Sequence, residues 1–398
     1  MNKELNPTEH DLTGLFKESK WGLSEEQRLI RDMVRDYAKS TVEPRAAEID
    51  KNSRFPEETF AEMAEMGLMG LPIPAQYGGG DADYLSYAIA IEELATVCAS
   101  TALGLAAHTS LICLPIYLFG SEAQKQAYLP RLTSGELGAY GLTEPNAGSD
   151  AGGTETTAVL KDDCYVLNGN KIFITNANYA SVFIATAVTA PGIGTKGISA
   201  FILEKTMAGF SLGSKDEKLG MRGSDWGTLQ FDNVKVPVAN RIGEAGKGFT
   251  YFMQTLDNGR ISIGALAVGI AQGALNKALQ YAKERHQFGQ SIANFQAIQF
   301  MLANMATDIE AARLLVYNAA RLKMAGHAFT KEASMAKLFA SEVASRAANA
   351  AIQIHGGYGY TKDFPVERYL RDAKLCEIGE GTSEIQRLVI GRKILENS

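Results

Sequence analysis

Residues 164–175 read CYVLNGNKIFIT, a short run rich in β-branched and aromatic residues with the period of two that is typical of a β-strand. Similar runs occur nearby in the sequence: TTAVL at 156–160, SVFIATAVTA at 181–190, KGISAFILEK at 196–205 and TLQFDNVKV at 228–236. Turn signals such as Asn168-Gly169 separate them. Because no helical pattern intervenes, these runs predict an antiparallel sheet or a small barrel.

Both flanks of this β segment have helical periodicity. SEEQRLIRDMVRDYA opens with a capping box from Ser24 to Gln27, and it places Leu29, Ile30, Met33, Val34 and Tyr37 on one face. Ser121 and Gln124 repeat the box. Long Ala-rich and Leu-rich helices follow from about residue 246. The sequence therefore predicts an α+β protein with an N-terminal helical domain (1–133), a middle β-domain (134–245) and a C-terminal helical bundle (246–398).

Bulk properties exclude several classes of protein. The net charge is −6 with no block of Lys or Arg, which argues against nucleic-acid binding. Cys98, Cys113, Cys164 and Cys376 are far apart, so we expect reduced thiols and no metal site. The first twenty residues have little periodicity and resemble no targeting peptide, which predicts a cytoplasmic location. Residues 94–121 carry no formal charge, but His108, Pro115 and several hydroxyls favour one or two buried helices over a membrane span.

Two motifs in the middle segment have ordinary explanations as well as functional ones. PGIGTKG matches a dinucleotide-binding fingerprint, yet a strand pattern follows it where a helix is required, so we interpret it as a hairpin loop. YGLTEPNAGSD, at 140–150, crowds hydroxyls and flexible backbone at a domain junction, where ligand pockets often form. An ordinary surface loop has the same composition. FITN, at 173–176, places Phe173 beside Thr175, which suits a flat heterocycle or a core.

Glu380 stands between two glycines in EIGEGTSEIQR, residues 377–387. Thr382 is a good N-cap for the helix that follows, so Glu380 is expected in a tight turn where backbone N–H groups point outward unpaired. Such groups can hold a developing oxyanion while the carboxylate takes a proton. A first-turn Glu that only complements the helix dipole fits the same spacing.

Taken together, these segments resemble the acyl-CoA dehydrogenase family, most closely its short-chain (butyryl-type) branch. The matching stretches appear in the family's order: YGLTEPNAGSD, FITN, KLGMRGSDWGTLQF, MQTLDNGR, ERHQFG with NFQAIQ, QIHGGYGY and EIGEGTSEIQR. The resemblance implies the same three domains, with a barrel-like antiparallel middle domain and a C-terminal four-helix bundle. It also implies FAD, a homotetramer and a role in fatty acid β-oxidation.

Residue roles follow from the resemblance, position by position. One flavin set would be Tyr140, Leu142, Thr143, Ser149, Phe173, Ile174, Thr175, Thr382 and Glu384. A second set would reach a flavin bound mainly by the neighbouring subunit: Arg285, Phe288, Gln296, Gln353, Gly356 and Gly357. The acyl-CoA site would comprise Ser149, Asp257, Arg260 and Gly381.

The implied reaction converts a short, possibly branched, acyl-CoA to trans-2-enoyl-CoA. Glu380 would remove the α-proton, the β-hydrogen would leave as hydride to flavin N5, and electron-transfer flavoprotein would receive the electrons. Isovaleryl-type relatives place the base immediately before the Arg of the LDNGR-type segment, but that position here is Gly259. Many relatives have Tyr at Gly379 and Trp at Phe173, which leaves the acyl preference open. The alternatives are an acyl-CoA oxidase on the same scaffold and a non-catalytic acyl-CoA-binding helical assembly.

Overall fold

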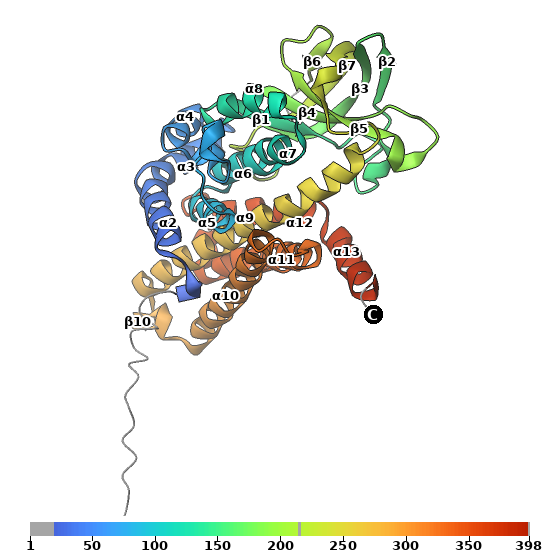
Figure 1. Cartoon of the computed structure of the whole chain (residues 1–398). Helices are drawn as coiled ribbons and strands as arrows, with labels where there is room; N and C mark the ends of the chain where they lie inside the picture. Colours follow the sequence, from blue (N-terminus) through green and yellow to red (C-terminus); the bar gives the residue numbers. More distant parts are fainter. Residues whose placement is uncertain (1–19, 214–215, 397–398) are drawn as a thin grey trace, which may run out of the picture.

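The computed structural model describes residues 20–213 and 216–396, in which an eight-stranded sheet follows a first set of helices and precedes a second set along the chain. Figure 1 shows the strands of this sheet gathered at the top, with the N-terminal and C-terminal helices packed together below them. The predicted α+β class is therefore confirmed. The expectation for the first twenty residues falls, except for Lys20, outside the described residues.

The N-terminal helices begin where the capping signals predict. Ser24 Oγ accepts the N–H of Gln27 at 3.1 Å, and Gln27 Oε1 accepts the N–H of Ser24 at 2.9 Å. Ser121 and Gln124 form the same reciprocal pair. The α-helices of this part are α2 (Glu25–Tyr37), α3 (Glu43–Asn52), α4 (Glu57–Glu65), α5 (Tyr84–Ala95), α6 (Ala99–His108), α7 (Leu114–Phe119) and α8 (Glu122–Thr133).

The apolar face predicted for α2 is only partly buried. The prediction was wrong because the face that packs against the protein is narrower than predicted. Val34 is fully buried, but Leu29 and Met33 remain 65% and 41% exposed. At about 100° per residue, these two side chains lie roughly 140° and 100° around the helix from Val34. The buried stripe instead includes Gln27.

The apolar stretch at 94–121 lies in the core, as predicted. Ala99–Phe119 forms one continuous helix with a π-helical turn, Thr109–Cys113, in its middle. Its length and hydropathy would suffice to cross a bilayer, yet 78% of its most apolar window is buried inside the protein. A core helix that is hydrophobic all round has this pattern.

The sheet is mixed rather than purely antiparallel. Its order is β6-β7-β3-β2-β4-β5-β8, and β1 pairs β4 in parallel, as does the first residue of β2, Thr157. The strands are β1 (Leu137–Gly141), β2 (Thr157–Lys161), β3 (Cys164–Thr175), β4 (Ala180–Val188), β5 (Ile198–Glu204), β6 (Phe210–Leu212), β7 (Trp226–Pro237) and β8 (Arg241–Ile242). PGIGTKG lies in the loop between the antiparallel strands β4 and β5, which confirms the hairpin.

The turn predicted at Asn168-Gly169 does not exist. Both residues lie inside β3, where the register with β7 shifts between Leu167 and Gly169. Gly169 has φ 140°, and a Cβ there would lie 2.6 Å from Thr156 Oγ1. Glycine is therefore favoured here because the strand bulges and Thr156 lies close to the backbone. The β2–β3 hairpin instead turns after Lys161.

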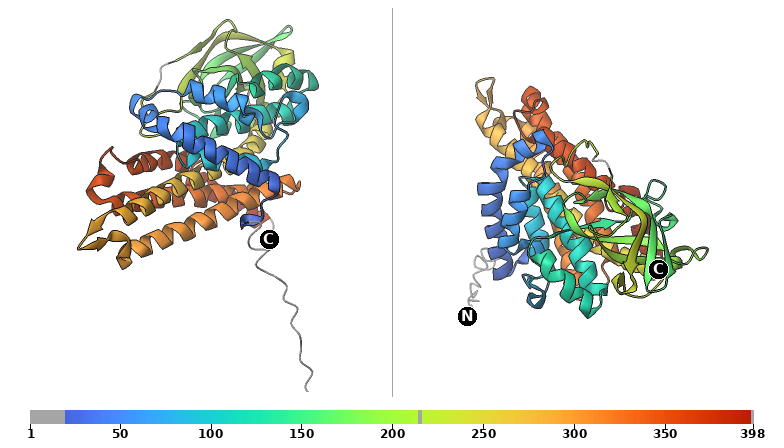
Figure 2. Two further views of the ribbon diagram at one scale, coloured as in Figure 1. Left: turned by 90° about the vertical axis from the view of Figure 1, so that its left-hand side faces the viewer. Right: turned by 90° about the horizontal axis from the view of Figure 1, so that it is seen from above.

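Long helices complete the chain. They are α9 (Gly248–Glu284), α10 (Gln296–Met324), α11 (Thr330–His355), α12 (Val366–Ile378) and α13 (Ser383–Glu396), with a small β9–β10 hairpin (His286–Gln287, Gln290–Ser291) after α9. Helix α9 packs against α5, α10, α11 and α12, and its first turns touch β5. The views in Figures 1 and 2 show it running from the sheet through the helical layers. It therefore links all three parts of the molecule.

Candidate active site

Glu380 lies in the turn that joins α12 to α13. Its φ is 53° and that of Gly381 is 93°, so two successive residues adopt left-handed backbone. For a residue with a side chain this conformation costs roughly 1–3 kcal/mol and persists only where its surroundings enforce it. Lys337 Nζ and Gln386 Nε2 donate to the carbonyl of Gly381 at 2.7 and 2.9 Å. These two bonds fix the turn.

The turn before α13 has backbone N–H groups without an acceptor in the described part of the chain. Thr382 Oγ1 accepts the N–H of Ile385 at 3.3 Å, which confirms the predicted N-cap. Among the described residues, no acceptor bonds the N–H groups of Glu380 and Gly381. The turn therefore offers donors to a ligand's oxygen next to a carboxylate.

One carboxyl oxygen of Glu380 is held out of water, and among the described residues no cation lies within ion-pair distance of the group. Its Oε2 is sealed from solvent and has no hydrogen-bond partner within the described part of the chain. Burial raises the pKa of Glu380 to about 7, although Lys337 and Arg260 pull it downward. A carboxylate with a pKa near neutrality suits a general base.

Gly259 on α9 lies against this carboxyl group. A Cβ at position 259 would stand 1.8 Å from Glu380 Oε2 and 2.9 Å from its Cδ. Only glycine leaves the carboxylate its observed position. The two base positions that the family resemblance implies, 380 and 259, therefore compete for one space here.

Asp257 and Arg260 lie on the same helix beside this contact. Arg260 Nη1 donates to Asp257 Oδ1 at 2.5 Å, and Thr330 Oγ1 donates to Asp257 Oδ2 at 2.6 Å. Arg260 is 4% exposed, and its Nε lacks a partner among the described residues. Of the four residues expected at the acyl-CoA site, Gly381 adjoins Glu380, Arg260 acts on it electrostatically and Asp257 bonds Arg260, whereas Ser149 lies exposed in the 142–156 loop.

An aromatic surface ends β3. Phe173 stands in a bulge where the β3–β7 register shifts, with φ 60° and half of its surface exposed. Trp226 lies 5.3 Å from its ring, and the Trp226 indole N–H donates to Thr175 Oγ1 at 3.3 Å. Bulges often present side chains at active sites. This surface offers open aromatic rings beside a hydroxyl, while Ile174 points into the core.

A buried ion pair holds the 142–156 loop beside that surface. Lys171 Nζ donates to Glu144 Oε1 at 2.6 Å and to the carbonyl of Leu142 at 3.0 Å. Glu144 also accepts two backbone N–H groups and the Thr154 hydroxyl. Burial alone would raise the pKa of Glu144, but Lys171 and these donors lower it to about 2. The pair therefore places Leu142 and Thr143 next to β3.

Breaking this pair should destabilise the middle domain. In Lys171→Met, Glu144 would remain 3% exposed without its cation, and an unpaired buried charge costs about 3–5 kcal/mol. We expect that loss in urea unfolding followed by tryptophan fluorescence. The double variant Glu144→Leu/Lys171→Met should recover much of it, because no charge is left buried. Equal stability of wild type and Lys171→Met would contradict this assignment.

The second predicted flavin set lies around the β9–β10 hairpin and the end of α11. Arg285, Gly356 and Gly357 line a cavity of about 480 Å³ together with Tyr281 and His355. The guanidinium of Arg285 lies 5.8 Å from the Tyr358 ring centroid. Phe288, Gln296 and Gln353 are exposed near it, and Phe288 is 92% exposed. The structure thus groups three of the six residues at one cavity and leaves three on the surface.

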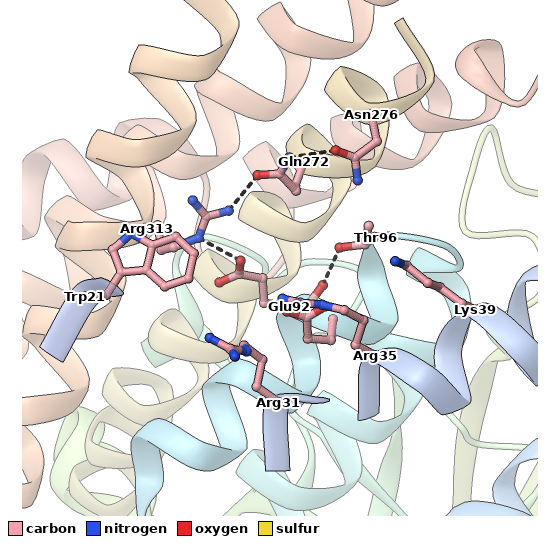
Figure 3. Close-up of a pocket in the computed structure, with 10 residues that line it drawn as sticks. Trp21, Arg31, Arg35, Lys39, Glu92, Thr96, Gln272, Asn276 and Arg313 are labelled. Atoms are coloured by element: carbon pink, nitrogen blue, oxygen red, sulfur yellow. Dashed lines mark hydrogen bonds and ion pairs between the residues drawn. The ribbon is translucent and has the colours of Figure 1, made fainter. Parts of the chain in front are cut away.

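A different cavity, of about 420 Å³, lies between α2, α5, α9 and α10 (Figure 3). Its lining holds two ion pairs: Arg313 Nε bonds Glu92 Oε1 at 2.8 Å, and Arg35 Nη2 bonds Glu93 Oε1 at 2.6 Å. It contains none of the predicted site residues. We interpret these contacts as structural ties between the N-terminal and C-terminal helices.

Comparison with known proteins decides the family. Residues 24–136, 139–234 and 246–395 match the family models described as the N-terminal, middle and C-terminal domains of acyl-CoA dehydrogenase. The chain belongs to the acyl-CoA dehydrogenase family. It is 54% identical to the short-chain specific acyl-CoA dehydrogenase of Clostridium acetobutylicum over 94% of this chain and 99% of that protein.

Solved structures of acyl-CoA dehydrogenase relatives agree with this assignment. Butyryl-CoA dehydrogenase from Megasphaera elsdenii superposes with a TM-score of 0.93 at 46% identity, covering 95% of this chain and 100% of that one. A chain from a study of the electron transferring flavoprotein of Acidaminococcus fermentans has the same TM-score at 49% identity, covering 95% and 100%. Acryloyl-CoA reductase (NADH) from Anaerotignum propionicum is 48% identical over 96% of this chain and 97% of that protein.

Acyl-CoA dehydrogenases are FAD enzymes, and similar solved structures contain FAD. The described residues fit this cofactor. Phe173 and Trp226 form an open aromatic surface beside the Thr175 hydroxyl, and a Cβ at Gly356 or Gly357 would meet nothing within 4 Å. The prediction of FAD is confirmed, while the roles of individual residues and the domain boundaries stay predictions.

Several residues of the site were missed from the sequence. Glu144, Lys171, Lys337 and Gln386 are all buried and shape the turn or the loop. Lys337 is a charge on an Ala-rich helix, but Lys331, Glu332, Glu342 and Arg346 share that signal. Glu144 and Gln386 have no such signal, since their partners depend on the tertiary fold.

Proposed function

We propose that this protein catalyses the FAD-dependent α,β-dehydrogenation of a short-chain acyl-CoA to trans-2-enoyl-CoA. The observation that carries this proposal is the Glu380 carboxyl group. Its Oε2 is sealed from solvent and unpaired among the described residues, burial raises the pKa of the group to about 7, and backbone N–H groups without an acceptor in that part of the chain lie beside it. A Glu that only complemented the helix dipole would be expected in contact with water, whereas Glu380 has one sealed carboxyl oxygen that lies against Gly259.

The residues around Glu380 account for the proton transfer. The α-proton of a thioester is weakly acidic, and its removal is easier when donors stabilise the enolate oxygen. The N–H groups at positions 380 and 381 supply such donors, and Glu380 takes the proton. Arg260 and Asp257 would hold the substrate beside Gly381. FAD, when bound, supplies the acceptor for the β-hydride.

The short-chain preference, the electron acceptor and the assembly rest on relatives and on exposed surfaces. Relatives at 46–54% identity are named short-chain specific or butyryl-CoA dehydrogenases. A similar chain comes from work on an electron transferring flavoprotein, which supports that class of partner. Phe288 in the β9–β10 turn and Phe300 and Leu314 on α10 expose apolar surface, as expected for a homo-oligomer, here a tetramer. The cytoplasmic location also stays a prediction.

A reductase that runs the reaction backward is the second candidate, because the acryloyl-CoA reductase relative is 48% identical. An oxidase or a non-catalytic acyl-CoA binder would share the scaffold. An anaerobic panel of straight and branched acyl-CoAs, followed by loss of the flavin absorbance, separates these functions. We expect bleaching that is strongest with four-carbon substrates and turnover that requires an electron-transferring flavoprotein. Oxygen consumption would indicate an oxidase, and no bleaching by any thioester would refute the proposal.

The pH dependence of turnover should report Glu380. The base works only as a carboxylate, and its pKa of about 7 means that the ionised fraction falls below neutrality. We therefore expect kcat/KM to fall about tenfold per pH unit below pH 7 and to level off above it. A profile that stays flat from pH 5 to 8 would contradict this assignment.

A further inference from the structure

Lys337 is a buried cation bound to the turn that carries the base. It lies on α11 with 0% of its surface exposed. Its Nζ donates to the carbonyl of Gly381 at 2.7 Å, and in the described chain no carboxylate lies within ion-pair distance of it. A buried ammonium that has only a peptide carbonyl as its acceptor is costly, so its position needs a reason.

Charged and titratable groups from three helices, α5, α9 and α12, act on Lys337 or Glu380. Tyr84 and Tyr87 on α5 interact with Glu380, as does Arg260 on α9. Cys376 and Glu377 on α12 also act on Lys337, as do Glu380 and Arg260. Burial raises the pKa of Cys376 to about 12, so its thiol is neutral and gives Lys337 no counter-charge at neutral pH.

The charge of Lys337 is present in the range where Glu380 titrates. Burial lowers the pKa of Lys337 to about 8, so the ammonium persists at pH 7 and is lost above pH 8. A nearby positive charge favours the ionised form of a carboxyl group and lowers its pKa. Removing Lys337 should therefore raise the pKa of Glu380 and leave less carboxylate at pH 7.

We propose that Lys337 is a positioning residue for the base: it holds the 379–382 turn through the carbonyl of Gly381, and its ammonium keeps Glu380 ionised. This role rests on the proposed function of Glu380 as the base. The two contributions are separable, because the bond to Gly381 needs a donor and the electrostatic effect needs a charge. Gln386, which donates to the same carbonyl, supplies only the first.

Two variants separate the contributions. Lys337→Gln keeps a donor and loses the charge, whereas Lys337→Met loses both. We expect both to move the midpoint of the pH–kcat/KM profile upward by roughly one unit, with activity regained at high pH. Lys337→Met should also lower the plateau at high pH, because the turn loses a bond. Lys331→Gln, at the accessible start of the same helix, is the control and should leave the profile unchanged.

Infrared difference spectroscopy tests the same shift without turnover. The C=O stretch of protonated Glu380, identified by its loss in Glu380→Gln, should titrate at a higher pH in both Lys337 variants than in wild type. This readout remains valid if no acyl-CoA is a substrate, so a failure of the proposed function stays distinguishable. A folded Lys337→Gln protein with an unshifted band and an unshifted profile would overturn the electrostatic role. A Lys337→Met plateau equal to that of Lys337→Gln would overturn the positioning role.

Discussion

Glu380→Gln should retain FAD and lose reduction of the flavin by butyryl-CoA by about three orders of magnitude or more. The amide keeps the size of the side chain but cannot accept the α-proton, and a general base contributes about 10²–10⁴-fold. The free N–H groups of the turn should still bind the thioester, so the loss should fall on the rate of reduction rather than on substrate binding. Anaerobic stopped-flow absorbance measures the two separately.

Glu65→Gln is the matched control for that substitution. Glu65 ends α4 in an exposed position, so the same chemical change there should leave the rate unchanged. The melting temperature and the flavin spectrum should be similar in wild type, Glu380→Gln and Glu65→Gln. A Glu380→Gln enzyme that reduces its flavin within tenfold of the wild-type rate would refute the assignment of the base.

Gly259→Ala should lower the rate of flavin reduction by about 100-fold. A Cβ at this position would lie 1.8 Å from Glu380 Oε2, so the carboxylate must move by more than an ångström to regain an ordinary contact distance. Displacement of a reacting group by about 1 Å can cost 10²-fold. The pH profile should also change, because the moved carboxyl group meets a different environment.

Gly391→Ala controls for adding a methyl group to a helical glycine. Nothing lies within 4 Å of a Cβ at Gly391 in α13, and alanine favours helix there. We expect its rate of reduction to match wild type. If Gly259→Ala also matched wild type, the carboxylate would not occupy the space that the structure gives it.

Local patterns predicted the elements of the fold but not their exact pairing. The capping boxes at Ser24 and Ser121 are short-range signals, and both form as predicted. Asn168-Gly169 has the composition of a hairpin turn, yet pairing of β3 with β7 on both sides of it makes it a bulge. The parallel pairing of β1 with β4 depends on the tertiary path of the chain, which no local period records.

The parts of the site whose residues lie close together in the sequence could be predicted. Glu380 stood out because glycines flank it, but its contact with Gly259 joins residues far apart in the chain. The Lys171–Glu144 pair depends on a loop folding back onto a strand. Lys337 reaches Gly381 only because α11 packs against the end of α12. Such long-range contacts follow from the packing of elements and leave no local pattern.

Anaerobic mixing of the purified FAD-loaded protein with butyryl-CoA tests the central claim most directly. We predict rapid loss of the oxidised flavin absorbance together with formation of trans-2-enoyl-CoA. The rate should rise with pH around a midpoint near 7, as the pKa of Glu380 requires. An oxidised flavin spectrum that persists with butyryl-CoA and with every other acyl-CoA tested would contradict the account.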